Sequence, residues 1–170
     1  RLAGRRACEH GPLEHEGLTA VVTEGRATGL LTHFQTLMAD RVMHIGRVRL
    51  ADVMIPMRDV VSAPREITRD ELIERTRDRN YSRIPLLAGD GRVTGVLDIY
   101  DVLARADGTS PAEMATEPLI LAADMPVTDA LYRMQREHAA MAVVAEAGAH
   151  VGIVTVKDVV EEIVGELEAW

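Results

Sequence analysis

The sequence has few residues of the kinds that form disulfides, basic surfaces or membrane spans. Its one cysteine, Cys8, cannot form an internal disulfide, which fits a reducing compartment. The 19 Lys and Arg residues are outnumbered by 27 Asp and Glu residues, and the formal charge of −8 argues against nucleic acid as a partner. The longest apolar runs, such as MAVVA at 141–145, are far shorter than the roughly 18 residues of a membrane-spanning helix, so no span is expected here.

The common motifs of catalytic sites are also lacking. The sequence contains no Gly-rich phosphate loop with a Lys, no G-x-S-x-G and no pairing of Cys with His, so an enzyme is not expected. Cys8, His10 and His15 have no paired downstream half, and an unstructured terminus is therefore preferred to a metal site.

Apolar residues are abundant enough to form a core. They make up 47% of the 170 residues, with only one Phe, one Trp and three Tyr, so the core should consist of Val, Ile, Leu, Met and Ala. This size predicts one medium domain or two small ones. The chain starts at Arg1 without a Met and stops at Trp170, so we expect a fragment of a longer protein.

An internal repeat organises most of the chain. Residues 93–104 (VTGVLDIYDVLA) align with residues 150–161 (HVGIVTVKDVVE) at an offset of 57, which places Asp101 on Asp158. The alignment extends upstream without a gap, and each copy has the same order of apolar runs, helical spacing and Gly-containing turns. Two β-α-β-β-α units of this size are too small to be independent, so the prediction is an α/β fold in which the repeats pack on each other.

Thr155 and Asp158 stand at the start of the last predicted helix. A Thr at the N-cap and an acid three residues later form a capping box, which satisfies free N–H groups at the helix start. The same two side chains offer hydroxyl and carboxylate groups to a ligand. On this segment alone, capping is the preferred interpretation.

The repeat pair resembles tandem CBS domains, also called a Bateman module. Such repeats end in G-h-h-[ST]-x-x-[DN], which GIVTVKD at 152–158 fits fully. Three segments are similar to the CorC/CNNM (hemolysin-C-like) family of magnesium and cobalt efflux proteins: VRLADVMIPMRDVV at 48–61, YSRIPLL at 81–87 and MAVVAEAGAHVGIVTVKDVVEEIVGEL at 141–167. The resemblance implies three parts: an N-terminal helical connector at 1–47, CBS repeat 1 at 48–107 and CBS repeat 2 at 108–170.

The resemblance also implies a function and a location. The chain would be a regulatory domain at the cytoplasmic face of the cell membrane, joined to a membrane domain that transports magnesium or cobalt. Its ligand would be an adenosine nucleotide, either ATP with Mg²⁺ as a companion of the phosphates, or AMP or ADP. Mg²⁺ is expected to bind through the nucleotide, because the sequence offers no cage of oxygen ligands.

The expected nucleotide site draws on both repeats. The resemblance places Thr155 and Asp158 on the ribose hydroxyls, and a carboxylate suits a cis-diol because it accepts two hydrogen bonds. Arg83 would contact phosphate through its planar fork of donors. The neighbouring residues expected to line the site are Ile55, Tyr81, Ser82, Ile84 and Pro85, although core packing is an equal alternative for Tyr81 and Ile84. Asp98 replaces the signature Thr in the first repeat and would repel phosphate, so one site per chain is expected.

Two segments depart from the family pattern. Ile55 stands where the family often has Thr, and residues 143–150 read VVAEAGAH where the family usually has V-V-D-E-Y-G-G-T. A structural dimerisation module with a decayed nucleotide site is therefore the alternative function.

A homodimer is expected in either case. Apolar residues on two helices of the second repeat exceed what one small sheet can cover, namely Leu131, Met134, Val159 and Ile163. The spacing of seven apolar residues also predicts an amphipathic connector helix that could pack on the module or on a second chain: Leu30, Leu31, Phe34, Leu37, Met38, Val42 and Ile45.

Overall fold

The computed structural model divides into two units, Arg1–Arg47 and Val48–Trp170. The residues that it describes are 20, 23–26, 28–30, 32–33, 35, 44–77, 81–105 and 108–164. Most of the predicted connector helix lies outside the described residues, as do Cys8, His10 and His15. The fold described below is that of the second unit.

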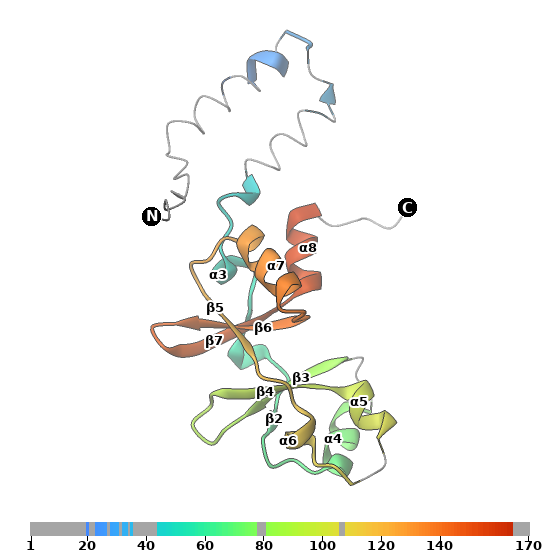
Figure 1. Cartoon of the computed structure of the whole chain (residues 1–170). Helices are drawn as coiled ribbons and strands as arrows, with labels where there is room; N and C mark the ends of the chain where they lie inside the picture. Colours follow the sequence, from blue (N-terminus) through green and yellow to red (C-terminus); the bar gives the residue numbers. More distant parts are fainter. Residues whose placement is uncertain are drawn as a thin grey trace, which may run out of the picture. The chain divides into compact units, whose positions relative to one another are not determined.

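The second unit contains two related sets of elements, which share a strand, a helix, two strands and a final helix (Figure 1). The first copy consists of α3 (Leu50–Val53), β1 (Ile55–Pro56), the 3₁₀ helix η1 (Met57–Asp59), β2 (Ala63–Pro64), α4 (Arg69–Thr76), β3 (Arg83–Leu87), β4 (Val93–Asp98) and α5 (Ile99–Ala104). The second consists of α6 (Pro111–Met114), β5 (Leu119–Ala122), α7 (Val127–Arg136), β6 (Met141–Glu146), β7 (Ala149–Thr155) and α8 (Val156–Val164). The predicted β-α-β-β-α order is confirmed from β2 to α5 and from β5 to α8.

Each repeat contributes one sheet, and the segment that precedes each repeat's own strands pairs with the sheet of the other repeat. The first has the strand order β2-β3-β4 and the second the order β1-β7-β6-β5. β1, which precedes the first repeat's own sheet, pairs antiparallel with β7, with Ile55 opposite Ile153 and Pro56 opposite Gly152. Likewise, Thr116, which precedes the strands of the second repeat, forms an isolated bridge with Val96 of β4 in the first repeat. The two repeats are therefore joined by backbone hydrogen bonds as well as by side-chain packing.

Several helices begin after a residue whose side chain caps their first N–H groups, as at α4, α5 and α6. Thr68 and Glu71 form a capping box at the start of α4, and Thr68 Oγ1 accepts a hydrogen bond from the Glu71 N–H. The helical spacing of the repeats predicts this helix over ELIERTRDR at 71–79 and the first helix of the second repeat over DALYRMQREH at 129–138. In the structure, α4 and α7 each begin two residues earlier. At α4 the difference arises because Thr68 caps the helix and so makes Arg69 its first residue. α7 instead begins directly after Pro126, which has no side-chain cap.

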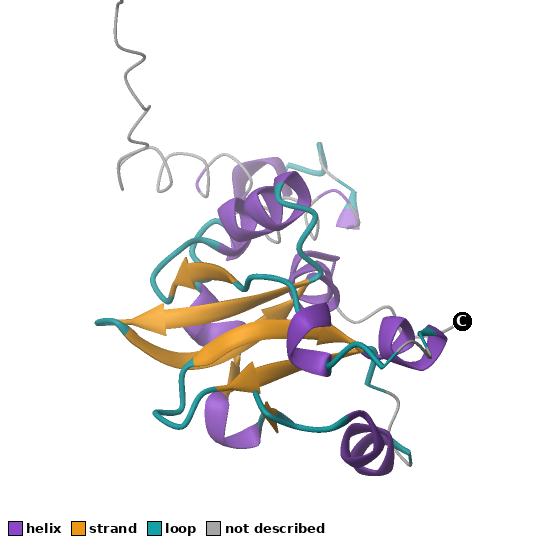
Figure 2. Cartoon of the chain, turned by 60° about the horizontal axis from the view of Figure 1, so that its bottom comes forward, coloured by secondary structure: helices purple, strands orange, loops and turns teal. Residues whose placement is uncertain are grey.

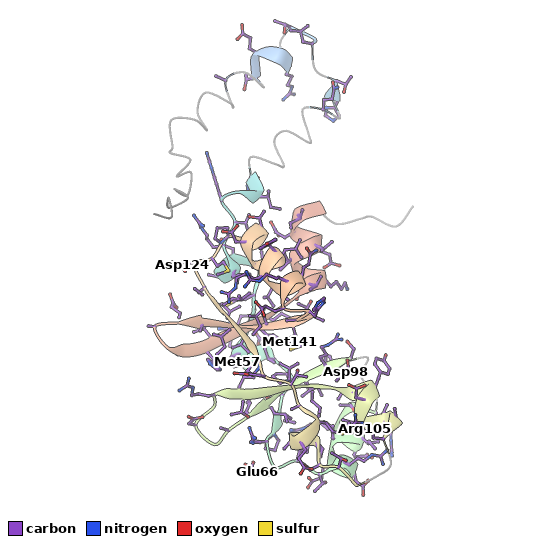
Figure 3. The ribbon with its side chains drawn as sticks, in the orientation of Figure 1. Met57, Glu66, Asp98, Arg105, Asp124 and Met141 are labelled. Carbon is purple, nitrogen blue, oxygen red and sulfur yellow. The ribbon has the colours of Figure 1, made fainter. Side chains whose placement is uncertain are left out.

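The strands lie at the centre of the second unit and the α-helices lie at its outside (Figures 1 and 2). The first repeat has a buried cluster between its sheet and helices, which includes Ile84, Leu86, Leu97 and Val102. A smaller cluster joins the repeats: Val96 of β4, Met141 of β6 and Ile153 of β7, with Met57 and Val60 packed against it. Met57 and Met141 are labelled between the two sheets in Figure 3. This contact positions the first repeat against the second.

Candidate functional site

Thr155 and Asp158 form a reciprocal capping box where β7 ends and α8 begins. The Thr155 hydroxyl donates to Asp158 Oδ2 at 2.7 Å and accepts from the Asp158 N–H at 3.3 Å, while the Thr155 N–H donates to the same Oδ2 at 2.9 Å. The predicted capping role is thus confirmed by geometry. These bonds use Oδ2 of the carboxylate, so Oδ1 is the oxygen with which Asp158 could accept from a ligand.

The capping box lies on the wall of a cavity of about 610 Å³. The lining combines the end of β7 and the first turn of α8 with η1, the residues that follow it, and the start of β3. Both repeats therefore contribute to one cavity. Its volume falls within the range of roughly 300–1,000 Å³ that is usual for small-molecule sites.

Seven of the eight residues expected at a ligand site line this cavity: Ile55, Tyr81, Ser82, Arg83, Pro85, Thr155 and Asp158. The eighth, Ile84, is fully buried in the core cluster of the first repeat and does not line it. The reason is the alternation of side chains along a strand, which turns Arg83 and Pro85 to one face of β3 and Ile84 to the other. Tyr81, by contrast, is 40% exposed. Of the two residues for which core packing was an equal alternative, Ile84 lies in the core and Tyr81 lines the cavity.

The cavity also contains charged residues that the sequence analysis did not select. Lys157, the chain's only lysine, and Asp59 both line it. With Arg83 and Asp158, they give the lining two positive and two negative side chains. Its place inside the T-x-x-D signature, in the first turn of α8, is the signal from which Lys157 could have been found.

Arg83 is ion-paired within the first repeat before any ligand is considered. Its Nη2 lies 3.1 Å from Asp98 Oδ2, and the two residues face each other across β3 and β4. Asp98 also caps α5, since its Oδ1 accepts from the Tyr100 N–H at 3.0 Å. The residue expected to bind phosphate is therefore already beside a carboxylate.

A second, smaller cavity of about 210 Å³ adjoins this ion pair. Three acidic side chains, Asp98, Asp101 and Glu117, line it together with Arg83 and His138. Arg83 thus lines both cavities. The predominance of acids in the second cavity makes it electrostatically unsuited to phosphate.

His150 of β7 connects the two repeats. Its Nδ1 accepts a hydrogen bond from the Val93 N–H at 3.0 Å, and these two residues occupy equivalent positions in the two repeats. Burial lowers the pKa of His150, the positive charge of Arg92 lowers it further, and Asp90 acts in the opposite direction. The neutral imidazole is therefore the form that suits this contact.

Two of the four helix residues on which the expected dimer contact was based are buried, whereas Leu131 and Ile163 are partly exposed. Met134 and Val159 are fully buried within their own repeat, so they cannot form an exposed apolar patch, and that part of the argument is wrong. Packing of α7 and α8 on their own sheet covers them. The large apolar side chains that the helices do expose are Tyr100 and Leu103 on α5, Tyr132 on α7 and Val160 on α8.

Two features are absent from the described part of the chain. Among these residues, no group of three or more His, Cys, Asp or Glu side chains is placed to hold a metal ion. Within the same residues, no helix combines the length and the apolar character that crossing a bilayer requires.

Comparisons with known proteins agree with this architecture. The model of the CBS domain family matches the chain twice, at residues 50–108 and 112–165. The chain is 30% identical over 164 residues to the magnesium and cobalt efflux protein CorC of Vibrio cholerae, and 29% identical over 160 residues to the protein YhdP of Bacillus subtilis. A solved structure, the CBS domain of the bacterial CNNM/CorC family Mg²⁺ transporter in complex with ATP, is 28% identical with a TM-score of 0.71.

The coverage of these matches is unequal. The aligned region covers 92% of this chain for CorC, 89% for YhdP and 76% for the ATP complex. The matched region is only 56% of CorC and 36% of YhdP, whereas it is 96% of the solved CBS domain. The chain thus corresponds to the whole of that domain and to about half or less of the longer relatives.

Proposed function

Because the chain belongs to the CBS domain family, we propose that its larger cavity binds an adenosine nucleotide, and that the bound state controls a divalent-cation transporter of the CorC/CNNM type. The observation that carries this proposal is the shared cavity, in which Thr155 and Asp158 of the second repeat lie with Arg83 of the first. The similarity to a CBS domain in complex with ATP supports the choice of ligand.

The lining offers a partner for each part of a nucleotide. Asp158 Oδ1 would accept a hydrogen bond from a ribose hydroxyl, and the Thr155 oxygen would accept another. Ile55, Tyr81 and Pro85 provide apolar and aromatic surface for the base. Arg83 and Lys157 supply the positive charge for the phosphates.

Magnesium would enter this site with the nucleotide. Among the described residues, the cavity has two carboxylates, Asp59 and Asp158, and they belong to no cluster of three or more metal ligands. Mg²⁺ is commonly held by one or two carboxylates together with phosphate oxygens and retained waters. The residues therefore fit Mg²⁺ as a companion of ATP. We expect Mg²⁺ alone to give no heat of binding at millimolar concentration, and to strengthen the binding of ATP. Tight binding of Mg²⁺ without nucleotide would contradict this assignment.

Calorimetry with matched variants tests the nucleotide site. Asp158→Ala removes a charge-assisted hydrogen bond to ribose, so the affinity for ATP should fall about ten- to a hundredfold, or roughly 1.5–3 kcal/mol. Asp101→Ala is the matched control, because Asp101 occupies the equivalent position in the first repeat and does not line the larger cavity. Its affinity for ATP should equal that of the wild type.

A second variant separates loss of binding from loss of folding, since Asp158 also caps α8. Tyr81→Ala leaves the capping box intact and should weaken ATP, ADP, AMP and adenosine alike if the ring lies on the base, by about 1–3 kcal/mol. Unchanged affinity in both Asp158→Ala and Tyr81→Ala would reject this cavity as the site. No binding of any adenosine compound to the wild type would leave the structural dimerisation module as the function.

We also propose that two copies of the chain associate through their exposed helix residues. Tyr100 and Tyr132 are 67% and 65% exposed, so each leaves aromatic surface that a second copy could cover. Light scattering should give twice the chain mass of 18.6 kDa. Tyr132→Arg should shift the protein to the monomer, whereas Ile120→Arg, a control at an exposed apolar residue of β5, should not. A monomer in the wild type would refute the dimer.

Control of transport belongs to the longer protein. Nucleotide binding between the repeats would favour one relative orientation of the two, and only such a difference in binding energy can shift a conformational equilibrium. The location at the cytoplasmic face of the membrane follows from the same proposal. Ion flux through the full-length protein should respond to ATP, and the response should disappear in Asp158→Ala.

A further inference from the structure

The ion pair between Arg83 and Asp98 is held in place from both sides. The two residues are direct cross-strand partners in β3 and β4, and their charged groups are 3.1 Å apart. The second oxygen of Asp98 accepts the Tyr100 N–H at the start of α5. The carboxylate therefore has a fixed position, and its side chain is only 26% exposed.

This fixed negative charge stands at the boundary of the larger cavity. Arg83 lines the larger cavity and the smaller one, whereas Asp98 lines only the smaller. Figure 3 shows Asp98 on the side of the first repeat that faces the second repeat. Any phosphate that contacts Arg83 from the larger cavity will consequently lie near the carboxylate of Asp98.

The second repeat shows that a cap at this position does not require a charge. The offset of 57 places Asp98 on Thr155 and Arg83 on Ala140. Thr155 caps its helix with a neutral hydroxyl, and Ala140 offers no partner for an ion pair. The charged pair is thus specific to the first repeat, where Asp98 both caps α5 and holds the Arg83 guanidinium.

We propose that Asp98 is a specificity-determining residue that competes with the phosphates of the nucleotide for Arg83. The inference rests on the proposed nucleotide site and adds to it. Asp98 lowers the affinity for phosphate, and it lowers it most for the nucleotide with the most phosphate charge. The site is thereby weakened for ATP relative to AMP, while adenosine is unaffected.

The physical reason is repulsion at short range in a partly exposed site. A phosphate that replaces Asp98 must break the ion pair, and a phosphate that shares Arg83 with Asp98 lies within several ångströms of the carboxylate. Both arrangements cost free energy, and the cost rises with each added negative charge. Because Arg83 and Asp98 are partly exposed, dissolved salt should reduce the effect.

The variant Asp98→Asn isolates this charge. Asn is as good an N-cap as Asp, so α5 keeps its cap while the negative charge is removed. Titration calorimetry at low salt should show ATP binding about three- to tenfold more tightly than in the wild type. The gain should be smaller for ADP, smaller again for AMP and absent for adenosine, and it should shrink in high salt.

Two controls make the test specific. Asp101→Asn removes the same charge from the same smaller cavity, but the described ion pair of Arg83 is with Asp98, so ATP affinity should stay close to the wild-type value. In the Arg83→Gln background, Asp98→Asn should give no gain, because the group for which the charges compete is gone. An equal gain for adenosine, a weaker binding of ATP, or a gain that persists without Arg83 would overturn the proposal.

Inorganic tripolyphosphate distinguishes this inference from the proposed function. Tripolyphosphate could bind more tightly to Asp98→Asn than to the wild type, while ATP binds no more tightly than tripolyphosphate. Competition for Arg83 would then be supported, and recognition of adenosine would be refuted. If ATP binds to the wild type and Asp98→Asn changes nothing, the nucleotide site stands and the competition fails. Absence of binding by both probes in every variant overturns both.

Discussion

Replacing Gly152 with Ala tests how the two repeats are joined. A Cβ added at Gly152 would lie 2.6 Å from the carbonyl oxygen of Ile55 and 2.8 Å from Sδ of Met54. The sulfur belongs to a flexible side chain, but the carbonyl belongs to β1, which is paired with β7 at this point. The backbone must therefore move apart for the methyl group to fit.

The expected cost follows from this overlap. Overpacking of a tight contact costs about 1–3 kcal/mol, and for a protein of this size that lowers the Tm by about 2–12 °C. Ile55 lines the larger cavity, so its displacement should weaken ATP binding as well. Thermal unfolding followed by circular dichroism and calorimetric titration with ATP measure the two effects.

Gly89→Ala is the matched control for this substitution. A Cβ at Gly89 would have no atom within 4 Å, and the residue does not have a positive φ. Its Tm should equal that of the wild type or exceed it slightly, because Ala restricts the unfolded chain. Equal Tm values for Gly152→Ala and Gly89→Ala would refute the idea that close approach of β1 to β7 requires a glycine.

Three other changes should affect stability in predictable directions. Gly95→Ala should lower the Tm in thermal unfolding, since the new methyl would lie 2.8 Å from Cβ of Ala115, and an unchanged Tm would contradict this. The free energy of unfolding should decrease as the pH falls below about 6.5, because the folded state lowers the pKa of His150 and the unfolded state takes up the proton first. His150→Gln should flatten that pH dependence in urea titrations, and an unchanged slope would contradict it. Thr68→Ala removes the N-cap of α4 and should cost about 0.5–2 kcal/mol in the same titrations, whereas no loss would show that the cap is dispensable.

Local patterns in the sequence were sufficient for the repeated units. The offset of 57 aligned β3, β4 and α5 with β6, β7 and α8, and the T-x-x-D spacing predicted the capping box that the hydrogen bonds of Thr155 and Asp158 confirm. Such features extend over a few residues and depend on backbone geometry close by, so they can be recognised without the rest of the fold.

The assignment of residues within a strand needed more than a resemblance. The segment from Tyr81 to Pro85 was expected to line a site as a whole, but alternation along β3 sends Ile84 into the core. Lys157 lies inside the T-x-x-D signature, but the signature gives no role to the residues between its Thr and its Asp. Its relevance became visible only when the cavity joined the first turn of α8 to the start of β3.

The sequence by itself determined the two repeats, their α/β order and the capping of the last helix, because period, turn and cap signals act between residues close along the chain. Only the tertiary structure decided that β1 pairs with the sheet of the other repeat, that Met134 and Val159 are covered, and that Arg83 is held by Asp98. These outcomes depend on which surfaces meet after the repeats pack. No short segment encodes them, since each contact joins residues from different elements whose spacing is set by the whole unit.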